Sequence, residues 1–211
     1  MKKALLFIIK RGSRFGAIVY PYSFAKFLGV LRSRIYTYWV TTKFKHFDDS
    51  SVFIFPITIL GEKYISVGKN VTIGSRTILT AWDNYENIKF NPQITIGDNV
   101  SIGEDCHITA INKIEIGDNV LMGKKITITD NAHGKSESEA LALSPIKRPL
   151  FSKGSVIIES GVWIGDKVTI LGGVKIGKNC IIGANSVVTS NIPENCVVGG
   201  IPAKILKNLN L

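Results

Sequence analysis

Residues 158–190 read IESGVWIGDKVTILGGVKIGKNCIIGANSVVTS, with an aliphatic residue at every sixth position. These positions are Ile158, Ile164, Ile170, Ile176, Ile182 and Val188. Glycine often follows the aliphatic residue and asparagine often stands three positions after it, as in Gly177 and Asn179. Both residue types tolerate tight corners and positive φ angles. A period of six matches neither an α-helix nor a coiled coil, so the pattern predicts short strands that turn and stack.

The same period extends through the preceding part of the chain. Earlier hexads begin at Val67, Ile73, Leu79, Ile96, Ile102, Ile108, Ile116, Met122 and Ile128. Taken three to a triangular coil, the fifteen hexads predict an all-β, parallel β-helix of about five coils. At a strand spacing of about 4.8 Å the prism is roughly 24 Å long. We expect this domain to span residues 52–192, and spacing alone leaves its hand open.

Two long insertions interrupt the repeat. Seventeen residues separate Leu79 from Ile96, so an extra loop projects near residues 80–95. Thirty residues, or five hexads, separate Ile128 from Ile158, so the register is kept while residues 130–157 are diverted outward. Loops on a rigid scaffold are where sites tend to be built. The second loop is therefore the first candidate for a catalytic loop.

Composition limits the function classes. The chain has 211 residues, enough for one well-buried core, and a net charge of +10. Residues 1–47 hold ten Lys and Arg and no acidic residue, which leaves the remainder neutral. A nucleic-acid-binding body needs a basic face, so we expect no nucleic acid partner. Three cysteines without CxxC spacing predict neither a disulfide framework nor a zinc cluster, and they favour a cytoplasmic location.

The ends of the chain lie outside the repeat. In residues 1–51 the longest early apolar run has six residues, too short for a signal peptide, and no run is long enough to span a membrane. From Pro21 onward, apolar residues recur at three- and four-residue steps and predict a basic amphipathic helix. That helix packs either on the protein or on an anionic membrane surface, and periodicity does not separate the two. Residues 193–211 are expected to form a cap with a short C-terminal helix.

Several motifs together carry a family likeness. The IGDNV, IGKNC and IGANSVVT hexads, the TDNAHG loop, VWIGDKVTI and the ending VVGGIPAK resemble the hexapeptide-repeat acyltransferases. The likeness covers residues 65–207 and points to the maltose, galactoside and capsular-polysaccharide O-acetyltransferase branch. It implies a left-handed β-helix, an exception to the usual right-handed crossover. It also implies a homotrimer with active sites between subunits, acetyl-CoA as acyl donor, a sugar hydroxyl as acceptor and no metal.

His133 matches the catalytic histidine of the family loop. Transfer of an acetyl group to an alcohol needs a base for the hydroxyl proton, and histidine has a suitable pKa. We expect His133 to act directly in a ternary complex, with Asp130 or Asn131 holding its other ring nitrogen. Many capsular relatives have a second histidine where Asn131 stands, so this chain departs from their pattern. The backbone N–H of Gly165 is the expected oxyanion donor.

The resemblance also suggests which residues bind the two substrates. Those expected to bind acetyl-CoA are Trp163 beside its groove, Ala184, Thr189 and Ser190 along the pantetheine arm, and Lys204 and Lys207 near the phosphates. Those expected to bind the acceptor are Trp82, Asp83 and Tyr85 of the first loop, and Asp105 and His107 before Ile108. Trp82, Asp83 and Tyr85 combine an aromatic platform with a carboxylate, which suits a sugar, although packing between subunits also explains them.

Other functions remain as alternatives. A β-helical carbonic anhydrase needs three zinc-binding histidines with one close pair, whereas this chain has only His46, His107 and His133, none of them close. An acetyltransferase acting on a xenobiotic or on serine, and a non-catalytic assembly module, both fit the repeat. The TDNAHG loop and the basic N-terminal segment favour surface polysaccharide biosynthesis, in the cytoplasm and peripheral to the inner face of the membrane.

Overall fold

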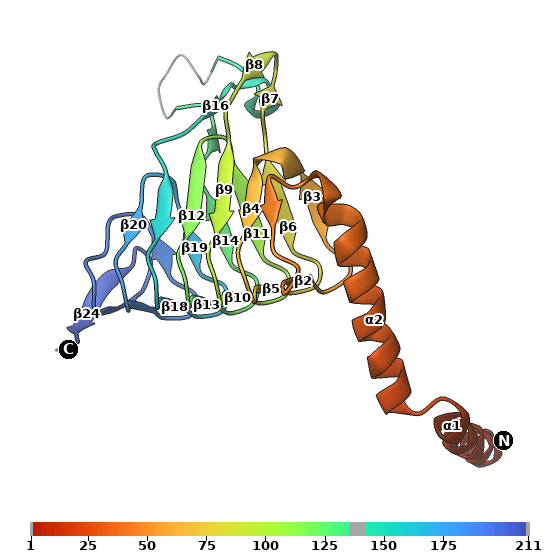
Figure 1. Ribbon diagram of the computed structural model, residues 1–211. Coiled ribbons are helices and arrows are strands. Elements are labelled where there is room, and N and C mark those ends of the chain that lie inside the picture. The colour runs from red at the N-terminus through yellow and green to blue at the C-terminus, as the bar shows by residue number, and fades with distance from the viewer. Residues whose placement is uncertain (1, 136–141, 210–211) are drawn as a thin grey trace.

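A computed structural model describes residues 2–135 and 142–209, and most of them form a triangular prism of short parallel strands (Figure 1). Sheet A contains β1 (His46–Phe47), β4 (Ile65–Val67), β9 (Gln93–Ile96), β12 (Lys113–Ile116), β17 (Val156–Ile158) and β20 (Lys175–Ile176). Sheet B contains β2 (Val52–Phe53), β5 (Thr72–Ile73), β10 (Ser101–Ile102), β13 (Leu121–Met122), β18 (Trp163–Ile164), β21 (Ile181–Ile182), β23 (Cys196–Gly199) and β24 (Lys204–Asn208). Sheet C contains β3 (Thr58–Leu60), β6 (Ile78–Ala81), β11 (His107–Ala110), β14 (Thr127–Thr129), β19 (Thr169–Ile170) and β22 (Val187–Val188).

The chain visits sheets A, B and C in turn, which confirms the predicted parallel β-helix. The predicted number of about five coils is too low. The described residues form six complete coils, from β1–β3 to β20–β22, and β23 begins another. The additional complete coil is the first, β1–β3, which precedes the first hexad. Its strands pair in register with β4–β6, for example Phe53 with Ile73, although it lacks the glycine corners that reveal the others.

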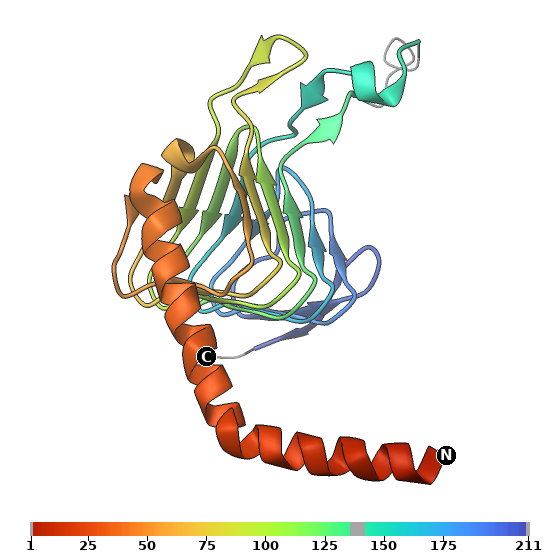
Figure 2. The ribbon, with the colours of Figure 1, turned by 90° about the vertical axis from the view of Figure 1, so that its right-hand side faces the viewer.

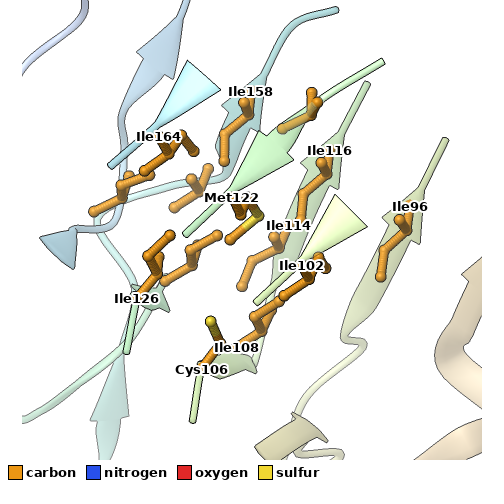
Figure 3. Close-up of a cluster of buried hydrophobic side chains, with 14 of the residues drawn as sticks. Ile96, Ile102, Cys106, Ile108, Ile114, Ile116, Met122, Ile126, Ile158 and Ile164 are labelled. Atoms are coloured by element: carbon orange, nitrogen blue, oxygen red, sulfur yellow. The ribbon is translucent and has the colours of Figure 1, made fainter. Parts of the chain in front are cut away.

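Each strand of the repeat points one or two apolar side chains into the prism, where they stack on their neighbours in adjacent coils (Figure 3). Ile96 pairs with Ile116, and Ile116 with Ile158, and each is at most 1% exposed. Burial of such a side chain is worth about 1.5–3 kcal/mol, so the stack is the main source of stability. The pairing across the second insertion also confirms that the register survives it.

Helix α2 (Tyr22–Val40) confirms the helix predicted from Pro21, but it packs with an unexpected face. Its buried residues are Ser33 and Thr37, which lie against the first coil. Thr37 Oγ1 accepts a hydrogen bond from the backbone N–H of Phe53 at 3.0 Å, and Ser33 Oγ accepts one from Phe55 at 3.3 Å. These bonds satisfy backbone donors at the open end of the prism, as edge strands require.

The apolar stripe of α2 is therefore largely exposed, and part of it borders a groove that Phe55 of the first coil also lines. Its exposed members are Phe24, Phe27, Leu28, Leu31, Ile35, Tyr38 and Trp39. Helix α1 (Lys2–Val19) precedes it, has no buried residue and extends away from the body (Figure 2). Tyr36 of α2 packs against Phe55 of the first coil with 5.0 Å between ring centroids, and the Arg32 guanidinium lies 4.6 Å from the centre of the same Phe55 ring. In the part of the chain that the structure describes, neither helix is long and apolar enough to cross a membrane.

The predicted C-terminal helix is wrong, because the end of the chain forms strand β24. It pairs antiparallel with β23, with Lys204 opposite Gly199 and Lys207 opposite Val197. A segment this short is a poor isolated helix, since nucleation is costly. The exposed edge of β23 instead offers a row of backbone partners, and β24 covers that edge.

The two insertions form small elements above the prism. The first carries the hairpin β7 (Asn84–Tyr85) and β8 (Ile88–Lys89), and a short 3₁₀ turn, η2 (Glu62–Tyr64), lies near its base. The second carries the ribbon β15 (Ala132–His133) and β16 (Leu150–Phe151), with the turn η3 (Pro145–Lys147) before β16. A third turn, η1 (Thr41–Lys43), follows α2. The hairpin and the ribbon lie on the same side of the prism (Figure 1).

Gly103 closes a corner where two coils approach closely. A Cβ atom there would lie 2.3 Å from the carbonyl oxygen of Gly123 in the next coil. We expect Gly103→Ala to lower the free energy of unfolding by about 1–3 kcal/mol, the usual cost of overpacking, as measured by urea unfolding. Gly12→Ala in α1, where an added Cβ meets no atom within 4 Å, is the matched control. An equal loss in both variants would contradict this explanation of the corner.

Candidate active site

His133 lies on the two-stranded ribbon that leaves the prism. The ribbon pairs Ala132 with Phe151 and His133 with Leu150, and the N–H of Gly134 donates to the carbonyl of Pro149 at 2.8 Å. Leu150 is buried, whereas the side chain of His133 is exposed. The imidazole is therefore presented to solvent from a paired strand and not from a free loop tip.

Asp130 fastens the ribbon to the prism. Its side chain is 1% exposed, and its carboxylate accepts hydrogen bonds from the backbone N–H groups of Ile111 at 2.9 Å and Asn112 at 2.8 Å. The amide of Asn131 donates to Asp130 and to the carbonyl of Thr109. The expected helper role of either residue toward His133 is thus not what the structure shows. Asp130 has the same parity as inward-facing Ile128, so strand alternation directs it away from the imidazole.

The residue beside His133 is instead Tyr85 of the other insertion. The Tyr85 hydroxyl lies 3.4 Å from Nδ1 of His133, and the two rings are edge-on with their centroids 5.4 Å apart. The same hydroxyl donates to the carbonyl of Ile146 at 2.7 Å. Glu86 and Lys147 add an ion pair at 3.6 Å between the two insertions. The structure therefore brings the candidate base together with one residue that the sequence assigned to the acceptor site.

A groove of about 530 Å³ runs beside the ribbon. Its lining includes Thr129 of sheet C, Leu171, Phe151 of the ribbon, and Lys153. Its volume lies within the roughly 300–1,000 Å³ of small-molecule sites. Lys135 Nζ lies 5.2 Å from the centre of the Phe151 ring and also borders the groove. Apolar walls beside two lysines suit a slender ligand that carries negative charge. Phe151, Lys153 and Leu171 were missed by sequence reasoning, although Phe151 and Lys153 come just before the chain rejoins the repeat at β17.

The other acceptor candidates of the first insertion hold that insertion in place. Asp83 forms an ion pair with Lys63 at 3.0 Å and accepts a hydrogen bond from the Tyr64 hydroxyl at 2.9 Å. The hydrogen bonds from Lys63 and Tyr64 lower the pKa of the Asp83 carboxyl. Trp82 next to it is partly exposed. Asp83 thus anchors the base of the hairpin, and Trp82 remains available to a ligand.

Asp105 and His107 have different surroundings. Asp105 occupies a corner with φ of 60° and pairs with Arg76 at 2.7 Å, which lowers the pKa of the carboxyl. His107 points outward from β11, in register with Thr127, on the face that also carries Thr129 of the groove. Burial lowers the pKa of His107, which favours a neutral imidazole at pH 7. His107 is therefore near the groove side of sheet C, whereas Asp105 braces a corner.

Gly165 does not have a free N–H for an oxyanion. Its N–H donates to the carbonyl of Ile182 at 2.8 Å as part of the ladder between coils. A Cβ at Gly165 would lie 2.7 Å from the backbone nitrogen of Ala184. The expected oxyanion role is contradicted, and the physical reason for the glycine is the close stacking of two coils.

The expected acetyl-CoA residues are spread over the later coils. Trp163 is 52% exposed on the outer face of sheet B, in register with Leu121 and Ile181. Exposed positions on the last complete coil and on β24 are those of Ala184, Thr189, Ser190, Lys204 and Lys207. In both ribbon views sheet B lies on the side of the prism opposite the ribbon (Figures 1 and 2). One protomer therefore does not bring Trp163 to His133. Among the described residues, no three His, Cys, Asp or Glu side chains gather to hold a metal ion.

Comparison with known proteins places this geometry in a family. The model "Bacterial transferase hexapeptide (six repeats)" matches residues 155–190. The "Putative lipopolysaccharide biosynthesis O-acetyl transferase WbbJ" of Escherichia coli K12 is 36% identical over 159 residues, which cover 74% of this chain and 78% of that protein. Galactoside O-acetyltransferase of the same organism is 29% identical over 72% of this chain and 68% of its own. A hexapeptide-repeat acetyltransferase from Vibrio cholerae, solved with acetyl coenzyme A, is 27% identical with a TM-score of 0.51, covering 74% of this chain and 72% of that chain.

The chain belongs to the hexapeptide-repeat acyltransferases, and its prism is the left-handed parallel β-helix of that family. The resemblance read from the hexads and the TDNAHG loop is thereby confirmed. Within the family the chain is an enzyme of the O-acetyltransferase group, with acetyl-CoA as its acyl donor.

Proposed function

We propose that this enzyme moves an acetyl group from acetyl-CoA to a sugar hydroxyl in surface polysaccharide biosynthesis, with His133 as general base. The observation that supports this most is the exposed imidazole of His133, held on a paired ribbon next to Tyr85 of the other insertion. The groove of about 530 Å³ beside the ribbon is lined by Ala132 and Gly134, the chain neighbours of His133, and not by His133 itself. The lipopolysaccharide and galactoside assignments of two relatives support the acceptor class.

His133 performs the proton transfers of the reaction. Its neutral imidazole takes the proton of the sugar hydroxyl as the oxygen attacks the thioester carbonyl carbon. The bond from that carbon to sulfur then breaks, and the imidazolium returns the proton to the departing thiolate. Both substrates are present together, so no acetyl-enzyme forms. The basic rim provided by Lys153 favours the negatively charged donor at the groove.

The active site is completed by a neighbouring copy in a homotrimer. An apolar stripe on sheet B supports contact with another subunit: Leu121 and the next in register, Trp163, are half-exposed, and Ile181 follows on the next coil. In one protomer strand β18 of sheet B, which carries Trp163, lies on the side of the prism opposite the ribbon that carries His133 (Figure 1). A second protomer, placed with sheet B toward the ribbon, supplies the donor-binding residues that the first lacks.

The activity is tested with a panel of acceptors. The enzyme is mixed with acetyl-CoA, a thiol reagent and free, nucleotide-linked or lipid-linked saccharides. Acceptor-dependent release of CoA and a product heavier by one acetyl group are expected for a saccharide. Serine and an acetylatable antibiotic belong in the same panel. A preference for either would overturn the sugar assignment, and no turnover with any acceptor would support a non-catalytic module.

The N-terminal segment attaches the enzyme to an anionic membrane surface, from the cytoplasmic side. Residues 1–47 carry ten basic residues and no acidic one, and both helices expose apolar side chains such as Phe7 and Trp39. Basic charge with exposed aromatic and aliphatic groups is the composition of helices that lie on lipid headgroups. Residues 1–51 then provide attachment, residues 52–192 the chemistry and residues 193–211 the cap.

Removal of residues 1–20 is expected to abolish most binding to vesicles that contain anionic lipid, measured by cosedimentation at low salt. Each lost basic residue near the surface is worth about 1 kcal/mol. Activity on a water-soluble acceptor should be retained, because α1 has no buried residue. Neutral vesicles serve as the control. A truncated enzyme that binds anionic vesicles as well as the full chain would contradict membrane attachment through α1.

A further inference from the structure

We propose that Tyr85 is a positioning residue that fixes the tautomer of His133, and this inference rests on the proposed role of His133 as the base. In this arrangement Nδ1 of the imidazole carries the proton and donates it to the Tyr85 hydroxyl oxygen. Nε2 then presents its lone pair to the sugar hydroxyl. Tyr85 acts through His133 and need not touch either substrate.

The positions of the hydrogens follow from the partners of the Tyr85 hydroxyl. A phenol has one hydrogen to donate, and a backbone carbonyl can only accept. The oxygen of Ile146 lies 2.7 Å from the hydroxyl, so the phenolic hydrogen points there. The lone pairs of the hydroxyl remain for Nδ1 of His133 at 3.4 Å. Since a neutral imidazole has one N–H, its placement on Nδ1 leaves Nε2 unprotonated.

The opposite tautomer, with its proton on Nε2, is disfavoured by the same hydrogen-bond argument. It would set the lone pair of Nδ1 against the lone pairs of the Tyr85 oxygen and would place the only proton on Nε2. An imidazole in that state has no free lone pair for the acceptor hydroxyl. The carbonyl of Ile146 therefore acts on His133 indirectly. It accepts the phenolic hydrogen of Tyr85, which makes the Tyr85 oxygen an acceptor toward His133.

Both rings are held so that this contact persists. The hairpin that carries Tyr85 is anchored at its base by Asp83, whose carboxylate forms an ion pair with Lys63 and accepts a hydrogen bond from the Tyr64 hydroxyl. The same hairpin is linked to the second insertion by the ion pair of Glu86 with Lys147. The exposed ion pair contributes little energy by itself, but it adds a second link between the two insertions. The edge-on packing of the two rings limits rotation of the imidazole.

No competing partner for Nδ1 is present among the residues first expected to hold it. The carboxylate of Asp130 is occupied by two backbone N–H groups, and the amide of Asn131 donates to Asp130 and Thr109. The two insertions of the repeat thus have a joint purpose. One carries the base, and the other carries the group that sets its protonation pattern.

The test compares Tyr85→Phe with Tyr36→Phe. Each variant loses a phenolic hydroxyl that donates to a backbone carbonyl, since the Tyr36 hydroxyl bonds Ile57 at 3.0 Å. Tyr36 packs where α2 meets the first coil, so only the Tyr85 variant loses a contact with His133. Turnover is measured with the saccharide acceptor, and the His133 tautomer is read by ¹⁵N NMR of histidine-labelled protein. The His133 signal is assigned by its absence in His133→Ala.

For Tyr85→Phe we expect kcat to fall about tenfold with an unchanged KM for acetyl-CoA, and the Nδ1–H tautomer to lose its predominance. Tyr36→Phe should match the wild type in kcat, KM and tautomer. An unchanged kcat for Tyr85→Phe would overturn the inference, and so would a lower kcat with an unchanged tautomer. His133→Ala separates the two proposals: if that variant remains active the base assignment fails, whereas if it is inactive and Tyr85→Phe is normal, only the role of Tyr85 fails.

Discussion

Replacement of His133 by alanine is expected to lower kcat by about 10²–10⁴-fold, the range for loss of a general base. The side chain is exposed at the end of a paired ribbon, so its removal should neither unfold the protein nor alter the groove. The dissociation constant of acetyl-CoA should therefore stay the same. Steady-state kinetics with a saccharide acceptor and calorimetric titration with acetyl-CoA measure the two quantities separately.

His46→Ala is the matched control for this variant. His46 is also exposed, but it lies on β1 of the first coil and not on the ribbon that carries His133. Its replacement should leave kcat unchanged. Near-wild-type turnover in His133→Ala would remove the base assignment, and a loss of acetyl-CoA binding would show that the histidine serves the donor site instead.

Replacement of Asp130 by alanine is expected to lower the free energy of unfolding by about 2–4 kcal/mol and also to reduce kcat. The change leaves the backbone N–H groups of Ile111 and Asn112 without their partner, Ile111 being buried. Each unsatisfied buried donor costs about 1–3 kcal/mol. Loss of the anchor also frees the base of the ribbon that carries His133. Urea unfolding gives the first effect and steady-state kinetics the second.

Asp118→Ala provides a comparison with the same chemistry in a different setting. Asp118 also accepts a hydrogen bond from a backbone N–H, that of Asp98 at 2.8 Å, but at an exposed corner where water can replace it. We expect this variant to lose less than about 1 kcal/mol. Equal losses in the two variants would contradict the view that burial makes Asp130 an anchor.

Much of the scaffold was predictable, because each hexad repeats one local rule: an inward aliphatic residue followed by a corner. The coil β1–β3 was not counted, since it follows the stacking without the glycine corners. Strand β24 was mistaken for a helix because its pairing depends on an edge that only the folded prism provides. The orientation of α2 was also not predictable from its apolar stripe, because Ser33 and Thr37 pack by hydrogen bonding to strand edges.

The site was predictable only where the repeat itself pointed to it. His133 stood out because it occurs in a long insertion that preserves the register. The inward direction of Asp130 was accessible in principle, since it continues the alternation of Ile128, but chemical expectation favoured a helper role. Tyr85 is 48 residues from His133 in sequence, and no local pattern relates the two. Their contact depends on how the hairpin of the first insertion and the ribbon of the second pack against each other above the prism.

The most direct test of the whole account is the activity of mixed trimers made from His133→Ala and Trp163→Ala subunits. We expect each variant alone to be inactive, because one lacks the proposed base and the other lacks a residue that we propose binds the donor. If each site takes His133 from one subunit and Trp163 from its neighbour, random equal mixing in a symmetric trimer restores both residues at about one quarter of the sites. Recovery of about one quarter of wild-type turnover is the predicted result. No recovery in verified mixed trimers would contradict an active site shared between subunits.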